Sequence, residues 1–183
     1  MKTILFFLFC STILSTHSIA IDNERVNSST LDTTQSTVKI ITLDQLEAIV
    51  TKSPKKYVLL EITATWCSPC VKDVMELIKR KKEFDALNVE LVFLFEKNSK
   101  IQHIEKLVPP NYRSFIVNTK GKKPKQNMKE IGLKLFPDLN EFYYSWPLSH
   151  FALVDKNMNR LLHHDPVNDS TDILLKIKEL NTL

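Results

Sequence analysis

The sequence predicts an α/β domain whose sheet contains both a parallel pair of strands and a hairpin. Apolar, β-branched runs at Tyr57–Ala64 and Val89–Phe95 enclose Val71–Phe84, in which apolar residues recur at helical spacing. A strand, a helix and a strand in this order form a right-handed crossover and a parallel pair. Two more runs, 149–154 and 160–163, flank a short polar turn and therefore predict the hairpin.

The remaining elements complete the same alternating pattern. Val38–Ile41 predicts a short first strand, and Thr42 with Gln45 forms a capping box at the start of the next helix. The other expected elements are helices at Ile101–Leu107 and Met128–Leu135, an extra strand at Tyr112–Val117, and a last helix from Ser170 with Ile173, Leu174, Ile177 and Leu180 facing inward. A hydrophobic content of 43% with 25% charged residues is typical of one globular domain.

The first twenty residues predict a secretory signal peptide. Lys2 is followed by the apolar run Ile4–Leu14, and Ser18-Ile19-Ala20 provides small residues for cleavage after Ala20. The run is shorter than the roughly 20 residues that span a bilayer. The protein is therefore expected to be exported, to a periplasm or out of the cell. Two alternatives are a lipoprotein acylated at Cys10 and an uncleaved signal anchor.

Residues 21–37 are polar and lack apolar periodicity, which predicts a flexible linker before a domain at 38–183. The net charge of +4 is mild and scattered, so no nucleic-acid partner is expected. Basic residues gather on the outer face of the predicted helix at 71–84: Lys72, Lys79, Arg80, Lys81 and Lys82. Such a run is usually a solvated face, and the alternative is electrostatic guidance of acidic partners.

After cleavage, Cys67 and Cys70 are the only cysteines. Two cysteines three positions apart do not form a disulfide scaffold, and a bridge over so short a loop constrains the unfolded chain little. The pair lies where a predicted strand meets a predicted helix, and a helix N-terminus stabilises a thiolate. The pattern therefore favours a reactive dithiol over a structural bridge.

The residues around this pair resemble the thioredoxin superfamily. Ala64-Thr-Trp-Cys-Ser-Pro-Cys70 follows the run Val58–Ile62, and Phe151–Asp155 is similar to the strand-turn ending of that family. The export signal makes the chain most similar to the exported oxidoreductases of the TlpA and ResA type. The resemblance implies a thioredoxin-like three-layer sandwich, with a central mixed sheet flanked by helices.

The resemblance also implies roles for the residues of the motif. Cys67 would be the attacking thiolate, and Cys70 would resolve the mixed disulfide. Glu61 would be a buried acid whose raised pKa lets it accept a proton from the resolving thiol; the alternative is a strand-edge carboxylate in solvent. Trp66 would offer partners a flat apolar contact, or else pack in the core.

One feature of this sequence departs from the family pattern. The family carries a cis-proline facing the cysteines, usually six residues before the aspartate that here is Asp155. Pro147 precedes Asp155 by eight residues, and Ser149 occupies the expected place. Either a two-residue bulge separates them or the proline is missing. If Pro147 is the cis-proline, Trp146 presents backbone groups to the substrate as a β-strand does.

These observations predict an exported thiol–disulfide oxidoreductase that acts on the disulfides or thiols of partner proteins, more as a reductant than as an oxidant. The dithiol is itself the redox centre, so no other cofactor is expected. The expected partner is a membrane electron donor or an exported client protein. The protein itself is expected to be a monomer. The alternatives are a non-catalytic binding or chaperone-like module, and a copper or zinc site joining the cysteines to His150, His163 or His164.

Overall fold

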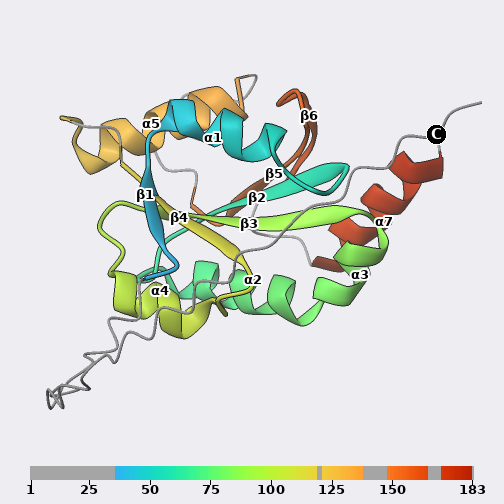
Figure 1. The fold of residues 1–183 in the computed structure, drawn as a ribbon, viewed down its shortest axis with the longest axis horizontal. Coiled ribbons are helices and arrows are strands. Elements are labelled where there is room, and N and C mark those ends of the chain that lie inside the picture. The colour runs from blue at the N-terminus through green and yellow to red at the C-terminus, as the bar shows by residue number, and fades with distance from the viewer. Residues whose placement is uncertain (1–35, 119–120, 138–147, 165–169, 183) are drawn as a thin grey trace, which may run out of the picture. The chain divides into compact units, whose positions relative to one another are not determined.

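The computed structural model in Figure 1 describes residues 36–118, 121–137, 148–164 and 170–182. The predicted signal peptide and nearly all of the linker lie outside these residues. None of the described helices has the length and hydrophobicity needed to cross a membrane.

A six-stranded mixed sheet forms the centre of the fold. Its strands lie in the order β1-β4-β3-β2-β5-β6. Their bounds are β1 Lys39–Ile41, β2 Tyr57–Thr63, β3 Val89–Glu96, β4 Arg113–Val117, β5 His150–Asp155 and β6 Arg160–His164. The first four strands in this order pair in parallel, whereas β5 is antiparallel to both β2 and β6. Every residue of β2 is buried, as its continuous apolar run predicts.

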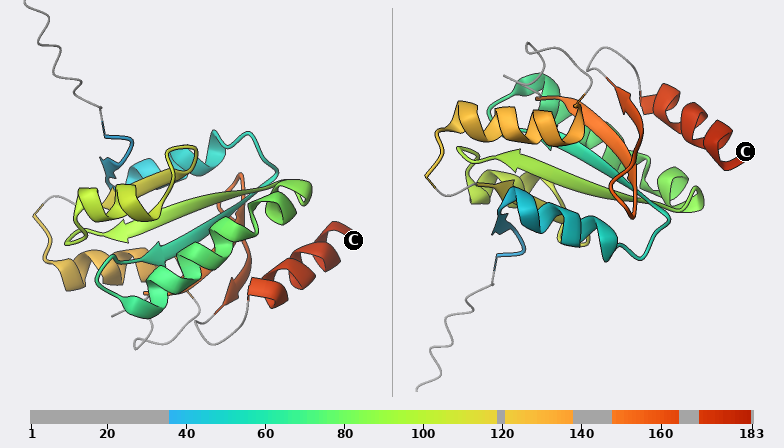
Figure 2. Two further views of the ribbon diagram at one scale, coloured as in Figure 1. Left: turned by 90° about the horizontal axis from the view of Figure 1, so that it is seen from below. Right: turned by 90° about the horizontal axis from the view of Figure 1, so that it is seen from above.

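Helices cover both faces of this sheet (Figures 1 and 2). Helices α1 (Leu43–Thr51) and α5 (Pro124–Leu135) share one apolar cluster with alternate residues of the central strands. The opposite cluster is shared by α2 (Ser68–Lys79), α3 (Lys81–Ala86), α4 (Ile101–Leu107) and α7 (Ser170–Thr182). The predicted three-layer sandwich is therefore confirmed.

The pleat of β2 divides its side chains between the two clusters. Val58, Leu60 and Ile62 pack with α1 and α5, whereas Leu59 packs with α2 and α7. Because successive side chains of a strand point to opposite faces, Glu61 lies on the α2 side with Leu59. This alternation places a carboxyl group beneath the helix that begins at the cysteine pair.

Two predicted helices have different bounds in the structure. The segment Val71–Phe84 is divided at Arg80, because no apolar residue occurs between Ile78 and Phe84 to continue the stripe. The turn at Arg80 lets Phe84 reach the core, where it is fully buried. Helix α5 begins at Pro124 and not at Met128, because proline suits a first helical turn.

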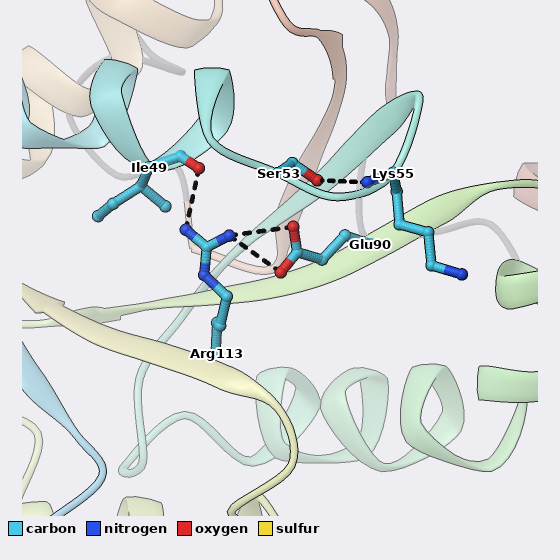
Figure 3. Close-up of polar contacts among 5 residues, drawn as sticks. All are labelled: Ile49, Ser53, Lys55, Glu90 and Arg113. Carbon is cyan, nitrogen blue, oxygen red and sulfur yellow. Dashed lines mark hydrogen bonds and ion pairs between the residues drawn. The ribbon is translucent and has the colours of Figure 1, made fainter. Parts of the chain in front are cut away.

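An ion pair joins β3 and β4 at the end of the sheet opposite the cysteines (Figure 3). Arg113 Nη1 lies 3.0 Å from both carboxylate oxygens of Glu90, and its Nη2 donates to the Ile49 carbonyl at 2.9 Å. On the neighbouring loop, the Ser53 hydroxyl accepts a hydrogen bond from Lys55 N. Arg113 thus ties α1 to both β3 and β4.

Candidate active site

The cysteine pair lies where β2 passes into α2, and the two sulfurs form a disulfide with Cα atoms 5.3 Å apart. Cys67 is the N-cap of α2, and its sulfur accepts a hydrogen bond from Cys70 N at 3.4 Å. Pro69 lies in the first turn, where its missing N–H leaves no unsatisfied donor. The Cys70 N–H at the start of the helix is thus directed at the Cys67 sulfur.

The two cysteines differ in exposure. Cys67 is half-buried and flanked by the exposed Trp66 and Ser68, whereas Cys70 is fully buried. A partner can therefore reach Cys67 first. Positive partial charge at a helix N-terminus lowers the pKa of a cysteine placed there, so the reduced Cys67 has the environment of a nucleophilic thiolate.

Glu61 is buried, with only 2% of its surface exposed. This burial contradicts the alternative of a strand-edge carboxylate in solvent. Desolvation raises the pKa of Glu61 well above its ordinary value, and the charge of Asp73 raises it further. Its Oε1 has no hydrogen-bond partner among the described residues. Glu61 can thus hold a proton at a pH where an exposed carboxyl has lost it.

Asp73 is a site residue that the sequence prediction missed. It lies on α2, three residues after Cys70, and it accepts a hydrogen bond from the Ser149 hydroxyl. Burial raises the pKa of Asp73, and the hydrogen bond from Ser149 offsets part of that rise. The spacing between Cys70 and Asp73 was visible in the sequence. The hydrogen-bond partner of Asp73, however, is 76 residues away in the chain, so the sequence did not indicate it.

Ser149 holds the start of β5 against the end of β2. Its N–H donates to the Ile62 carbonyl at 2.7 Å, and its backbone adopts the left-handed region with φ of 62°. This is the residue at the place expected for the family's proline. Trp146 and Pro147 lie outside the described residues, so their substrate-binding roles stay predictions.

Trp66 is 52% exposed, which contradicts a core-packing role. Its indole Nε1 lies 3.4 Å from Glu96 Oε2, which also accepts a hydrogen bond from Asn98 N at 2.8 Å. Thr65 N donates to the Ser99 hydroxyl at 3.2 Å. The loop before Cys67 is therefore attached to the β3–α4 connection. Sequence reasoning missed Glu96 and Ser99, because both are distant in the chain.

The histidines of the metal alternative have other contacts. The rings of His150 and His163 lie edge-on to Phe136, with centroids 6.0 and 6.2 Å away, and His150 Nδ1 is 2.9 Å from the Leu148 carbonyl. His164 is the last residue of β6. Within the described ranges, no group of three or more histidine, cysteine, aspartate or glutamate side chains could hold a metal ion.

No family model matches the sequence, and no curated protein matches it. Solved structures do match. A thiol:disulfide interchange protein from Bacteroides sp. is 17% identical, with a TM-score of 0.50 over 77% of this chain and 78% of that one. The yeast mitochondrial 1-Cys peroxiredoxin is 17% identical, with a TM-score of 0.51 over 75% and 68% of the two chains. The protein has a thioredoxin-like fold.

A third match extends the range of proteins that share this fold. Arabidopsis thaliana ScoI, solved with copper bound, is 15% identical, with a TM-score of 0.50 over 75% of this chain and 89% of that chain. The thioredoxin-like fold places the Cys67–Cys70 pair at the C-terminal end of a central strand and at the N-terminus of a covering helix. This agrees with the sequence resemblance in both architecture and location of the motif.

Proposed function

We propose that this protein is a thiol–disulfide oxidoreductase that exchanges its Cys67–Cys70 pair with the disulfides or thiols of partner proteins. The observation that carries the proposal is the disulfide between a half-buried Cys67 that caps α2 and a fully buried Cys70. A structural bridge has no need for one accessible sulfur at a helix start, whereas thiol exchange requires it.

In the reducing direction, the Cys67 thiolate attacks one sulfur of a client disulfide and displaces the other as a thiolate. Cys70 then loses its proton and attacks the Cys67 sulfur. The Cys67–Cys70 disulfide forms, the mixed disulfide breaks, and the client leaves with two electrons and both of its sulfurs as thiols or thiolates. The reverse sequence oxidises a client dithiol. The two sulfurs carry the electrons, so the proposal requires no further cofactor.

Glu61 is proposed as the base that takes the proton from Cys70. Its burial under α2 and its raised pKa support this role, because a more basic carboxylate accepts a thiol proton more readily. Asp73 acts through Glu61 in this scheme, because the negative charge of Asp73 raises the pKa of Glu61. Trp66 is proposed to contact the client beside Cys67, which its exposure supports.

An insulin-reduction assay with dithiothreitol as electron donor tests the proposal. The wild-type protein should accelerate insulin reduction, and Cys67→Ser should abolish the acceleration, because it removes the attacking sulfur. Leu175→Ala, which changes an exposed side chain of α7 and keeps both sulfurs, is the control and should retain the activity. A wild-type protein without activity would overturn the proposal. Metal found in stoichiometric amount in protein purified without chelators would favour the copper or zinc alternative.

The client can be trapped covalently. Cys70→Ala removes the resolving thiol, so Cys67 should remain joined to its partner as a stable mixed disulfide. Mass spectrometry of such adducts identifies the trapped partner. The two expected classes of partner are exported client proteins and a membrane electron donor, and the protein itself is proposed to be a monomer. The double variant Cys67→Ser, Cys70→Ala should trap nothing.

We also propose that the protein is exported and acts mainly as a reductant. The first twenty residues support export, and the resemblance to exported reductases supports the direction. Cleavage after Ala20 predicts that protein recovered from the exporting cell begins at Ile21, which N-terminal sequencing measures. An intact Met1 would contradict cleavage, and an acylated Cys10 would favour the lipoprotein.

A further inference from the structure

A groove of about 310 Å³ lies beside the cysteine motif, between the start of α2 and one side of α4. Its lining residues are Thr65, Val71, His103, Lys106 and Leu107. Thr65 precedes Cys67 by two positions, and Val71 directly follows Cys70 and donates its N–H to the Cys67 carbonyl at 3.0 Å. The lining therefore includes one residue on each side of the cysteine pair in the chain.

The α4 wall of the groove is fixed relative to the motif. His103, Lys106 and Leu107 are spaced at three and four residues, so they share one side of the helix. The chain leading into α4 is hydrogen-bonded to the motif loop through the Ser99 hydroxyl at Thr65 N and through Glu96 at the Trp66 indole. A client segment in the groove would thus meet its lining at a defined distance from Cys67.

The charge of the groove has one sign. Of its five lining residues, Lys106 is cationic and none is acidic. Two more exposed lysines border it in the sequence: Lys72 follows Val71, and Lys100 is the N-cap of α4.

The nearby acids are engaged elsewhere or lie off the lining. Asp73 accepts its hydrogen bond from Ser149, and Glu96 is buried against Trp66 and Asn98. Glu105 is exposed on α4 but does not line the groove.

We propose that this groove binds an acidic stretch of the client polypeptide that flanks the client's reacting cysteine. The inference rests on the proposed thiol–disulfide exchange and names the class of client that this exchange prefers. Complementary charge near a reacting pair raises the encounter rate and disfavours partners of like charge. The apolar Val71 and Leu107 provide contact area for the stems of the client's side chains.

Three short peptides test the charge preference. Each carries one cysteine blocked by a neutral 2-thiopyridyl group, and they differ only in two flanking residues, which are Glu, Gln or Lys. Reduced protein attacks the peptide sulfur and releases pyridine-2-thione, whose absorbance gives the rate; Cys70 then frees the peptide thiol. Rates with dithiothreitol correct for the intrinsic reactivity of each peptide.

The corrected rate should fall from the Glu to the Gln to the Lys peptide, by about two- to fivefold at each step, the range of one surface charge pair. The preference should fade in about 1 M salt, where charges are screened beyond about 3 Å. Lys106→Gln should weaken the preference, and Lys106→Glu should remove or reverse it. Lys178→Glu makes the same charge change on an exposed site of α7 and should preserve it.

Different results overturn different claims. Equal corrected rates for the three peptides would overturn the acidic-client inference and leave the exchange chemistry standing. A Glu preference that survives Lys106→Glu would overturn the assignment to this groove. A reduced protein that reacts with none of the peptides would instead overturn the proposed function.

Discussion

The Ser149 hydroxyl donates a hydrogen bond to the Asp73 carboxylate and thereby joins the start of β5 to the second turn of α2. Asp73 in turn acts electrostatically on Glu61, which lies on β2. Side chains from β2, from α2 and from the residue before β5 are thus coupled on the α2 face of the sheet. A change in one of them is expected to alter the proton affinity of the others.

Ser149→Ala tests this coupling. Loss of the hydrogen bond should raise the pKa of Asp73, because the bond now lowers it. A more protonated Asp73 repels the Glu61 charge less, so the pKa of Glu61 should fall. The variant should lose about 1–3 kcal/mol of stability, because the hydrogen bond is to a carboxylate. Carboxyl-carbon NMR titration measures both pKa values.

The matched control is Ser53→Ala. Ser53 is a buried hydroxyl that accepts from Lys55 N at the other end of the sheet (Figure 3). This control should lower the stability by about 0.5–1.5 kcal/mol, the net value of a neutral hydrogen bond, and leave both carboxyl titrations unchanged. Identical titrations in Ser149→Ala and the wild type would contradict the coupling.

Glu61→Gln should change how stability depends on pH. The folded-state pKa of Glu61 is raised, so folding is favoured while the carboxyl is protonated in both states. That contribution is fully present below the ordinary glutamate pKa of about 4.3 and is lost as pH rises through the folded pKa. The oxidised variant should therefore gain stability relative to the wild type as pH rises through this window.

Urea denaturation of both oxidised proteins across this pH range measures the difference. Glu179→Gln removes an exposed carboxyl of α7 and should follow the wild type. Stability curves of Glu61→Gln and wild type that stay parallel throughout the range would show that Glu61 does not titrate as its burial requires. If Glu61 is the base proposed for the resolving thiol, the variant should also accumulate the mixed disulfide in rapid-quench experiments.

Trp66→Ala should weaken the reaction with protein disulfides selectively. Loss of a large aromatic contact typically costs about 1–2 kcal/mol, so KM for a protein disulfide should rise roughly 5- to 30-fold. The rate with a small neutral disulfide should change little, because that substrate needs no contact with Trp66. Leu175→Ala removes an equally exposed apolar side chain from α7 and should affect neither. An equal fall in kcat/KM for the protein disulfide and for the small disulfide would contradict a role of Trp66 in binding the client.

Arg113→Met should destabilise the fold and preserve the chemistry. It removes the bonds to Glu90 and to the Ile49 carbonyl, at the sheet end opposite the cysteines. Hydrogen bonds to charged groups contribute about 1.5–3 kcal/mol, so the urea midpoint should fall accordingly. Arg113→Lys should have an intermediate urea midpoint, because an ammonium group cannot make the paired hydrogen bonds of a guanidinium. A loss below about 0.5 kcal/mol would contradict a structural role.

Local sequence patterns predicted the elements that carry the motif. The continuous apolar run of β2 predicted a buried strand, and that run also predicted correctly that Glu61 is buried. The cysteine spacing and Pro69 predicted where α2 begins. These features depend on residues close together in the chain, so their signals survive in the sequence alone.

Features that depend on distant contacts were not predicted. An extra strand was expected at Tyr112–Val117, but its place between β3 and β1 follows from pairing that no short segment encodes. The bond between Asp73 and Ser149 and that between Trp66 and Glu96 likewise join residues far apart in the chain. The division at Arg80 was missed because the apolar spacing was extended across it.

Because Cys67 is both the accessible sulfur and the cap of α2, the helix start would act on it in both directions of the proposed exchange. Donors that favour negative charge on this sulfur raise the fraction of Cys67 present as thiolate, the form that attacks a disulfide. The same donors make it a better leaving group when a second thiol attacks the client sulfur of the mixed disulfide. The same donors stabilise the reduced protein relative to the disulfide, so they shift the Cys67–Cys70 pair towards a stronger oxidant.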